Sequence, residues 1–83
     1  MSLTKNVTLK RNYRKEIKMR AQILKTLEAH FQAHIDKHVM NVEIMLENPM
    51  GIPEHTDFME SIEAELAHIA EYEDKLEALK HFN

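Results

Sequence analysis

Three histidines recur at a regular spacing in the first half of the chain. His30, His34 and His38 are each four residues apart, so on a helix they climb one side and drift by about 40° per step. In the second half, Glu65 and Glu73 fall within an apolar pattern, and Glu65 with His68 forms a Glu-x-x-His motif. Helical bundles that bind metal ions use this spacing, and a set of imidazoles and carboxylates suits zinc or iron.

Two interpretations of these residues stay open. In the first, His34, His38, Glu65 and His68 bind zinc or iron. In the second, which we favour, they form a polar layer without a cofactor, in which His38 meets Glu65 and His34 lies near Glu73. A layer of this kind would fix how the two helices align, as buried polar groups do in some helical assemblies.

Charge is unevenly distributed along the chain. Residues 1–25 contain eight lysines and arginines and one acidic residue, whereas residues 26–83 contain three and thirteen. The basic end can contact the phosphates of a nucleic acid without reading base sequence. We favour the alternative, in which these side chains face water or pair with acidic residues of a partner chain. The candidate nucleic-acid contacts are Lys10, Arg11, Arg14, Lys15, Lys18 and Arg20.

The sequence contains no motif typical of a catalytic site, and we predict that the protein is not an enzyme. Cysteine is absent, the single glycine cannot make a phosphate-binding loop, and neither Ser2 nor Ser61 lies in a nucleophile motif. No apolar stretch approaches the roughly 20 residues of a membrane span. We therefore expect a soluble cytoplasmic protein that does not contact membranes.

The positions of glycine and proline predict an all-α fold with one turn. Gly51, Pro49 and Pro53 lie within five positions, and no other glycine or proline occurs. We expect a long helix over about 12–47, a second helix over about 57–81, and an antiparallel hairpin as a single domain over 1–83. Residues 1–11 form a basic extension for which disorder is an open alternative. Facing residues should have numbers that sum to roughly 104, because the connection is short.

Apolar residues repeat at helical spacing in both predicted helices. The stripe of the first contains Tyr13, Ile17, Leu24, Phe31, Ile35, Val42 and Leu46. The stripe of the second contains Phe58, Ile62, Leu66, Ile69, Tyr72, Leu76 and Leu79. A second apolar shoulder of the first helix, formed by Met19, Ile23, Met40 and Ile44, lies away from its stripe.

One hairpin cannot cover both apolar surfaces of its first helix. Two helices share a single seam, and a core of this size rarely supports a fold. We therefore predict a coiled-coil-like homodimer that forms a four-helix bundle and buries the shoulder together with the projecting end of the first helix. The predicted interface residues are Tyr13, Ile17, Met19, Ile23, Met40 and Ile44.

The segment from Val42 to Asp57 resembles short uncharacterised proteins of tailed bacteriophages that infect marine bacteria. The shared pattern is the Asn-Pro-x-Gly-Ile turn of Asn48 to Ile52 with the adjoining helix end and cap. This resemblance implies a viral helical hairpin, located in the host cytoplasm, and assigns no activity to any residue.

Overall fold

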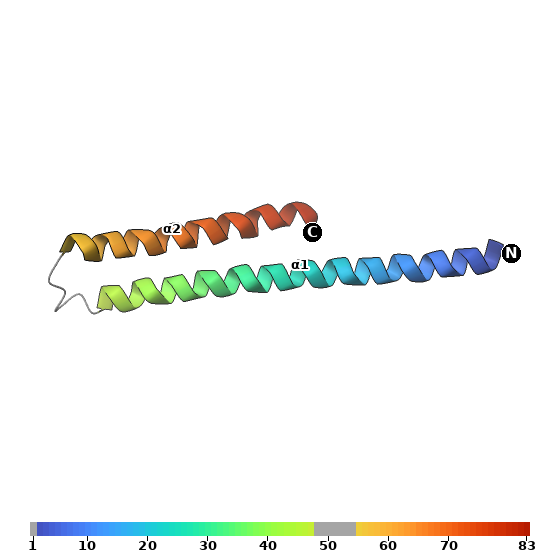
Figure 1. The fold of residues 1–83 in the computed structure, drawn as a ribbon, viewed down its shortest axis with the longest axis horizontal. Coiled ribbons are helices and arrows are strands. Elements are labelled where there is room, and N and C mark those ends of the chain that lie inside the picture. Colours follow the sequence, from blue (N-terminus) through green and yellow to red (C-terminus); the bar gives the residue numbers. More distant parts are fainter. Residues whose placement is uncertain (1, 48–54) are drawn as a thin grey trace.

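The described part of the chain forms an antiparallel helical hairpin (Figure 1). The computed structural model describes residues 2–47 and 55–83. Helix α1 spans Ser2–Glu47, helix α2 spans His55–Leu79, and a short 3-10 turn, η1, follows over Lys80–Phe82. These residues include no strand, which confirms the all-α prediction. None of the described helices combines the length and apolar character that a membrane crossing requires.

Helix α1 is longer than the sequence pattern predicts. It begins at Ser2 rather than near residue 12, and it continues without a break to Glu47. The segment 1–11 lacks glycine and proline, so nothing in it stops a helix once the following turns have formed. At 1.5 Å per residue, its 46 residues make a rod of about 69 Å.

The connection between the helices lies outside the described residues. It includes the predicted Pro/Gly turn, Pro49 to Pro53, with Ile52. Helix α2 begins at His55, slightly before the predicted start, so Asp57 lies in its first turn. A carboxylate is favourable there because the backbone N–H groups at a helix start carry partial positive charge.

The molecule is elongated because α1 extends well beyond α2. Its principal dimensions are 78 × 17 × 13 Å, and the N-terminus lies far from the C-terminus along the long axis (Figure 1). Arg20 marks where α2 stops, since its Nη2 donates a hydrogen bond of 2.7 Å to the carbonyl oxygen of Phe82. The projecting end of α1, residues 2–19, therefore has no α2 residue beside it.

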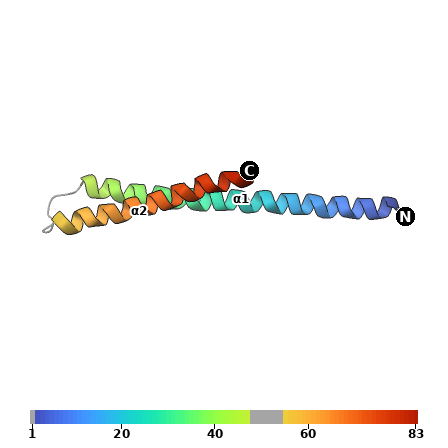
Figure 2. The same cartoon turned by 90° about the horizontal axis from the view of Figure 1, so that it is seen from above.

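The two helices wind around each other along one seam. Figure 2 shows α2 crossing obliquely over α1. The partly buried residues of α2 alternate in steps of four and three, which is the repeat of a left-handed coiled coil; they are Phe58, Ile62, Glu65, Ile69, Tyr72, Leu76 and Leu79. Two stripe predictions are therefore wrong. Leu66 and Leu46 are 52% and 61% exposed, and the neighbouring Glu65 and Met45 lie in the seam instead.

Burial within the hairpin is slight. Among the side chains described from 14–47 and 57–83, only Ile35 and His38 are buried, with 8% and 9% of their surface exposed. Many large apolar side chains keep about half their surface in contact with water, including Ile17, Met19, Ile23, Met40 and Ile44. A single seam between two helices has no interior, since each seam residue still has solvent on two sides.

Candidate functional site

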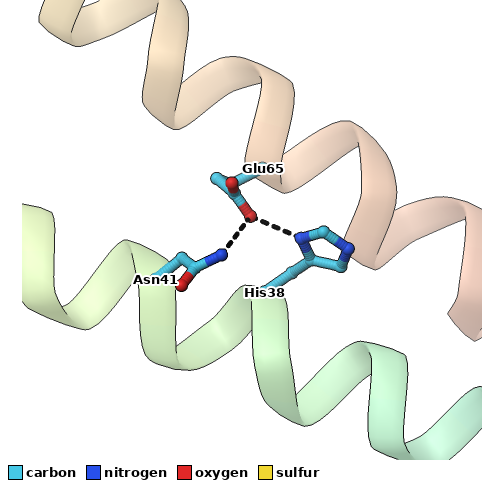
Figure 3. A network of polar contacts seen from close by, with 3 residues as sticks. All are labelled: His38, Asn41 and Glu65. Atoms are coloured by element: carbon cyan, nitrogen blue, oxygen red, sulfur yellow. Dashed lines mark hydrogen bonds and ion pairs between the residues drawn. The ribbon is translucent and has the colours of Figure 1, made fainter.

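A three-residue polar network joins α1 to α2 in the middle of the seam (Figure 3). The Nδ1–H of His38 donates to Oε2 of Glu65 across 2.5 Å. The Nδ2 amide of Asn41 donates to the same oxygen across 3.2 Å. His38 and Asn41 lie one turn apart on α1, so both reach the single carboxylate that α2 presents between them.

Burial and hydrogen bonding together determine the charge state of Glu65. The Glu65 side chain keeps 18% of its surface exposed and that of His38 11%. The hydrogen bonds from His38 and Asn41 hold the pKa of Glu65 below its ordinary value of 4.5, and partial burial opposes them. The carboxylate is therefore ionised at neutral pH, and both α1 donors are directed at its charge.

Next to this network, four flat side chains form a stacked layer (His34, His38, His68 and Tyr72). The rings of His38 and His68 lie 4.6 Å apart at 17°, and those of His34 and Tyr72 lie 4.3 Å apart at 8°. His34 precedes His38 by four residues on α1, and Tyr72 follows His68 by four residues on α2. Because the helices are antiparallel, the pair His34–Tyr72 lies one turn along the seam from the pair His38–His68. In this part of the seam, α1 and α2 therefore contact each other through stacked rings rather than through aliphatic side chains.

Tyr72, and not the predicted neighbour Glu73, is the α2 residue on which His34 stacks. Glu73 is exposed, because one residue along a helix turns the side chain by about 100°. Burial lowers the pKa of His34 from 6.5, and the positive charges of His30, Lys37, His38 and Lys75 lower it further. The imidazole of His34 is thus held in its neutral form against the phenol ring.

The four candidate metal ligands are adjacent but do not point to one place. Lone pairs of imidazole nitrogens lie in the ring plane, so the near-parallel rings of His38 and His68 direct them along two separate planes. The Nδ1 of His38 is also engaged with Glu65. Within residues 2–47 and 55–83, no three His, Asp or Glu side chains are arranged to hold a metal ion.

The candidate nucleic-acid residues fall into three groups. Arg14, Lys15 and Lys18 are exposed on the projecting end of α1. Arg20 is also exposed, and it donates a hydrogen bond to the carbonyl of Phe82 in η1, where the negative end of the helix dipole favours a cation. The side chains of Lys10 and Arg11, like that of the interface candidate Tyr13, lie outside the described part of the structure.

Sequence reasoning missed three contributors to this site. Asn41 is one turn from His38, and that spacing could have placed it beside Glu65. Tyr72 was identified only as an apolar stripe residue, although its spacing from His68 puts the two rings on one face. Lys75 lies over Tyr72 with its Nζ 4.7 Å from the ring centroid, a cation–π contact that sequence spacing alone does not select.

We expect Glu65→Gln to reduce the loss of stability in acid. Because the pKa of Glu65 is lowered in the folded chain, its contribution is present above pH 4.5 and is lost as pH falls through the lower folded value. Thermal melts followed by circular dichroism between about pH 7 and pH 3 should show a shallower acid decline for the variant. Glu63→Gln is the matched control at an exposed position. Equal acid slopes for the two variants would refute the assignment.

We expect His34→Phe to remove part of the pH dependence nearer neutrality. The lowered pKa of His34 means that its neutral form stabilises the hairpin above pH 6.5, and that this contribution is lost as pH falls through the folded value. Phenylalanine keeps a ring against Tyr72 but binds no proton. The Tm of the natural chain should fall more between about pH 7 and pH 5 than that of the variant. His81→Phe, at an exposed position, should behave like the natural chain.

No protein-family model, curated protein or solved structure matches the chain. The resemblance of the turn segment to phage proteins therefore stays a prediction.

Proposed function

We propose that this chain is a non-enzymatic, self-associating helical module that acts through surfaces rather than through a reaction. The observation that carries the proposal is the small amount of apolar surface that one hairpin buries. Ile35 is its one buried apolar side chain among those described, while five candidates for the interface stay about half exposed.

Apolar surface of this extent is costly to leave in water. Burial contributes about 25 cal/mol per Å², and an 83-residue chain with one seam offers little of it. A second hairpin packed against the shoulder of the first, in a four-helix assembly, would cover the apolar side chains that the seam leaves exposed.

The polar network supports a structural rather than a catalytic role. Each group in it is engaged by another group of the hairpin, with the carboxylate of Glu65 shared by two donors. Such a layer aligns α1 and α2 and leaves the outer faces to make contacts. We propose that Glu65, His38 and Asn41 set the alignment of the hairpin, which then presents its apolar shoulder to a partner.

We expect light scattering to give a solution mass of about twice the 9.8 kDa of the chain. The Tm should also rise with protein concentration, because association stabilises the folded state by mass action. A mass of one chain at every concentration up to the high micromolar range, with a constant Tm, would rule out self-association.

Nucleic-acid binding is the second candidate, and the exposed cations of the projecting end favour it. Arg14, Lys15 and Lys18 are exposed where α2 no longer lies beside α1. If they contact phosphates, affinity for duplex DNA or RNA should fall steeply with salt, by roughly one power of salt concentration per contact.

The titration that checks this candidate compares the natural chain with Lys15→Gln/Lys18→Gln. The double variant should bind more weakly and with a smaller salt slope, whereas Lys75→Gln on α2 should not change the slope. Absence of binding by the natural chain at low salt would eliminate this candidate and leave self-association unaffected.

A further inference from the structure

We propose that α1 docks antiparallel on α1 of a second copy of this chain through the shoulder formed by Met19, Ile23, Met40 and Ile44. The inference rests on the proposed self-association and specifies the face and direction. Each of the four residues is between 53% and 62% exposed, and none lies in the seam with α2.

The spacing of the shoulder fits a coiled-coil contact. Met19 and Met40 are 21 residues apart, as are Ile23 and Ile44, and 21 residues are three heptads. A helix with a 3.5-residue repeat therefore places all four residues on one line. The residues between them on the same line are exposed and mostly polar: Thr26, His30, Ala33 and Lys37. The shoulder thus has two apolar ends that flank a polar centre.

This arrangement is self-complementary under a twofold axis through the middle of α1. With antiparallel helices, Met19 lies opposite Ile44 of the partner subunit, and Ile23 lies opposite Met40 of the partner subunit. Lys37 then faces Thr26 of the partner subunit rather than a second lysine. Each of the four shoulder residues thus meets another shoulder residue, and each contact occurs twice, as in an isologous interface.

One end of the shoulder contains a hollow that could receive a side chain of the second copy. A shallow hollow is lined by Met19, Gln22, Ile23, Thr26 and Leu27. Four of these residues have the spacing i, i+3, i+4 and i+7, which is the set that surrounds an inserted side chain in knobs-into-holes packing. The partner's Met40 or Ile44 is the knob that the antiparallel alignment brings to it.

Charge favours the antiparallel direction over the parallel one. A parallel pair would place Arg14, Lys15 and Lys18 beside their own copies. The antiparallel pair places residues 14–20, which carry four cations and Glu16, beside the end of the partner's α1, which carries Glu43 and Glu47. Glu16 falls opposite Glu47 in this alignment, but the net charges of the two segments are opposite, whereas the parallel pair opposes segments of like net charge.

Spin-label distances distinguish the two directions. The chain has no cysteine, so Lys18→Cys and Ala29→Cys each give one labelling site outside the four shoulder residues. In the antiparallel dimer, the label at 18 should lie about 40 Å from its copy, whereas the label at 29, near the twofold axis, should lie within about 20 Å of its copy. A parallel dimer gives short distances at both sites and overturns the inference.

A charge introduced into the shoulder provides the second measurement. Ile23→Lys should weaken the dimer by about tenfold or more, because it buries an unpaired cation, while its helical circular dichroism at high concentration is retained. Ala78→Lys at an exposed position of α2 is the matched control. A dimer unaffected by Ile23→Lys would show that the shoulder is not the interface, whereas a monomeric natural chain would refute the proposed function itself.

Discussion

The small surface area that the two helices bury against each other is the constraint on which the other features of this structure depend. Two helices in contact bury one line of side chains each, and those side chains still face water on both flanks. Ile35 and His38 are the two residues, among the described side chains, of which the hairpin leaves less than a tenth exposed. The alignment of α1 and α2 and the outward-facing apolar shoulder both follow from this geometry.

A seam with little apolar area needs another source of specificity, and here it is polar. An aliphatic seam tolerates sliding by a heptad, because one leucine or isoleucine resembles the next. The carboxylate of Glu65 has hydrogen-bond partners at only one position, between His38 and Asn41. Sliding the helices would leave a partly buried charge without donors, which is a larger penalty than misaligned methyl groups. The ring contacts His34–Tyr72 and His38–His68 add flat surfaces that match at the same alignment.

The asymmetry of charge complements this asymmetry of burial. Basic residues concentrate in the part of α1 that projects beyond α2, and acidic residues concentrate in the rest of the chain. Arg20 lies at the boundary, where its hydrogen bond to Phe82 joins η1, which follows α2, to α1. Beyond this point α1 extends past the end of α2 (Figure 1). The proposed second copy in the antiparallel direction would cover the exposed apolar residues and bring the separated charges together.

Much of the architecture could be predicted from the sequence, because it depends on local rules. One cluster of glycine and proline in an otherwise unbroken chain permits one turn, and a short connection makes the helices antiparallel neighbours. The pairing of His38 with Glu65 also followed from residue spacing and an approximate alignment. The N-terminal start of α1 was less predictable, because a segment without helix breakers can continue a helix at little cost in free energy.

Only the tertiary structure decided which of two adjacent residues lies in the seam. A straight helix repeats every 3.6 residues, and on that period Leu46 belongs to the apolar stripe of α1. Helices that wind around each other adopt an effective repeat of 3.5, so the contact line drifts along each helix by about 20° per heptad. That drift brings Met45 inward and turns Leu46 to the outside. On α2, Glu65 lies in the seam while Leu66 is exposed, and His38 and Asn41 bond the Glu65 carboxylate. His34 likewise stacks on Tyr72 and not beside Glu73. Which residue meets which across the seam depends on both helices and is not contained in the pattern of either one.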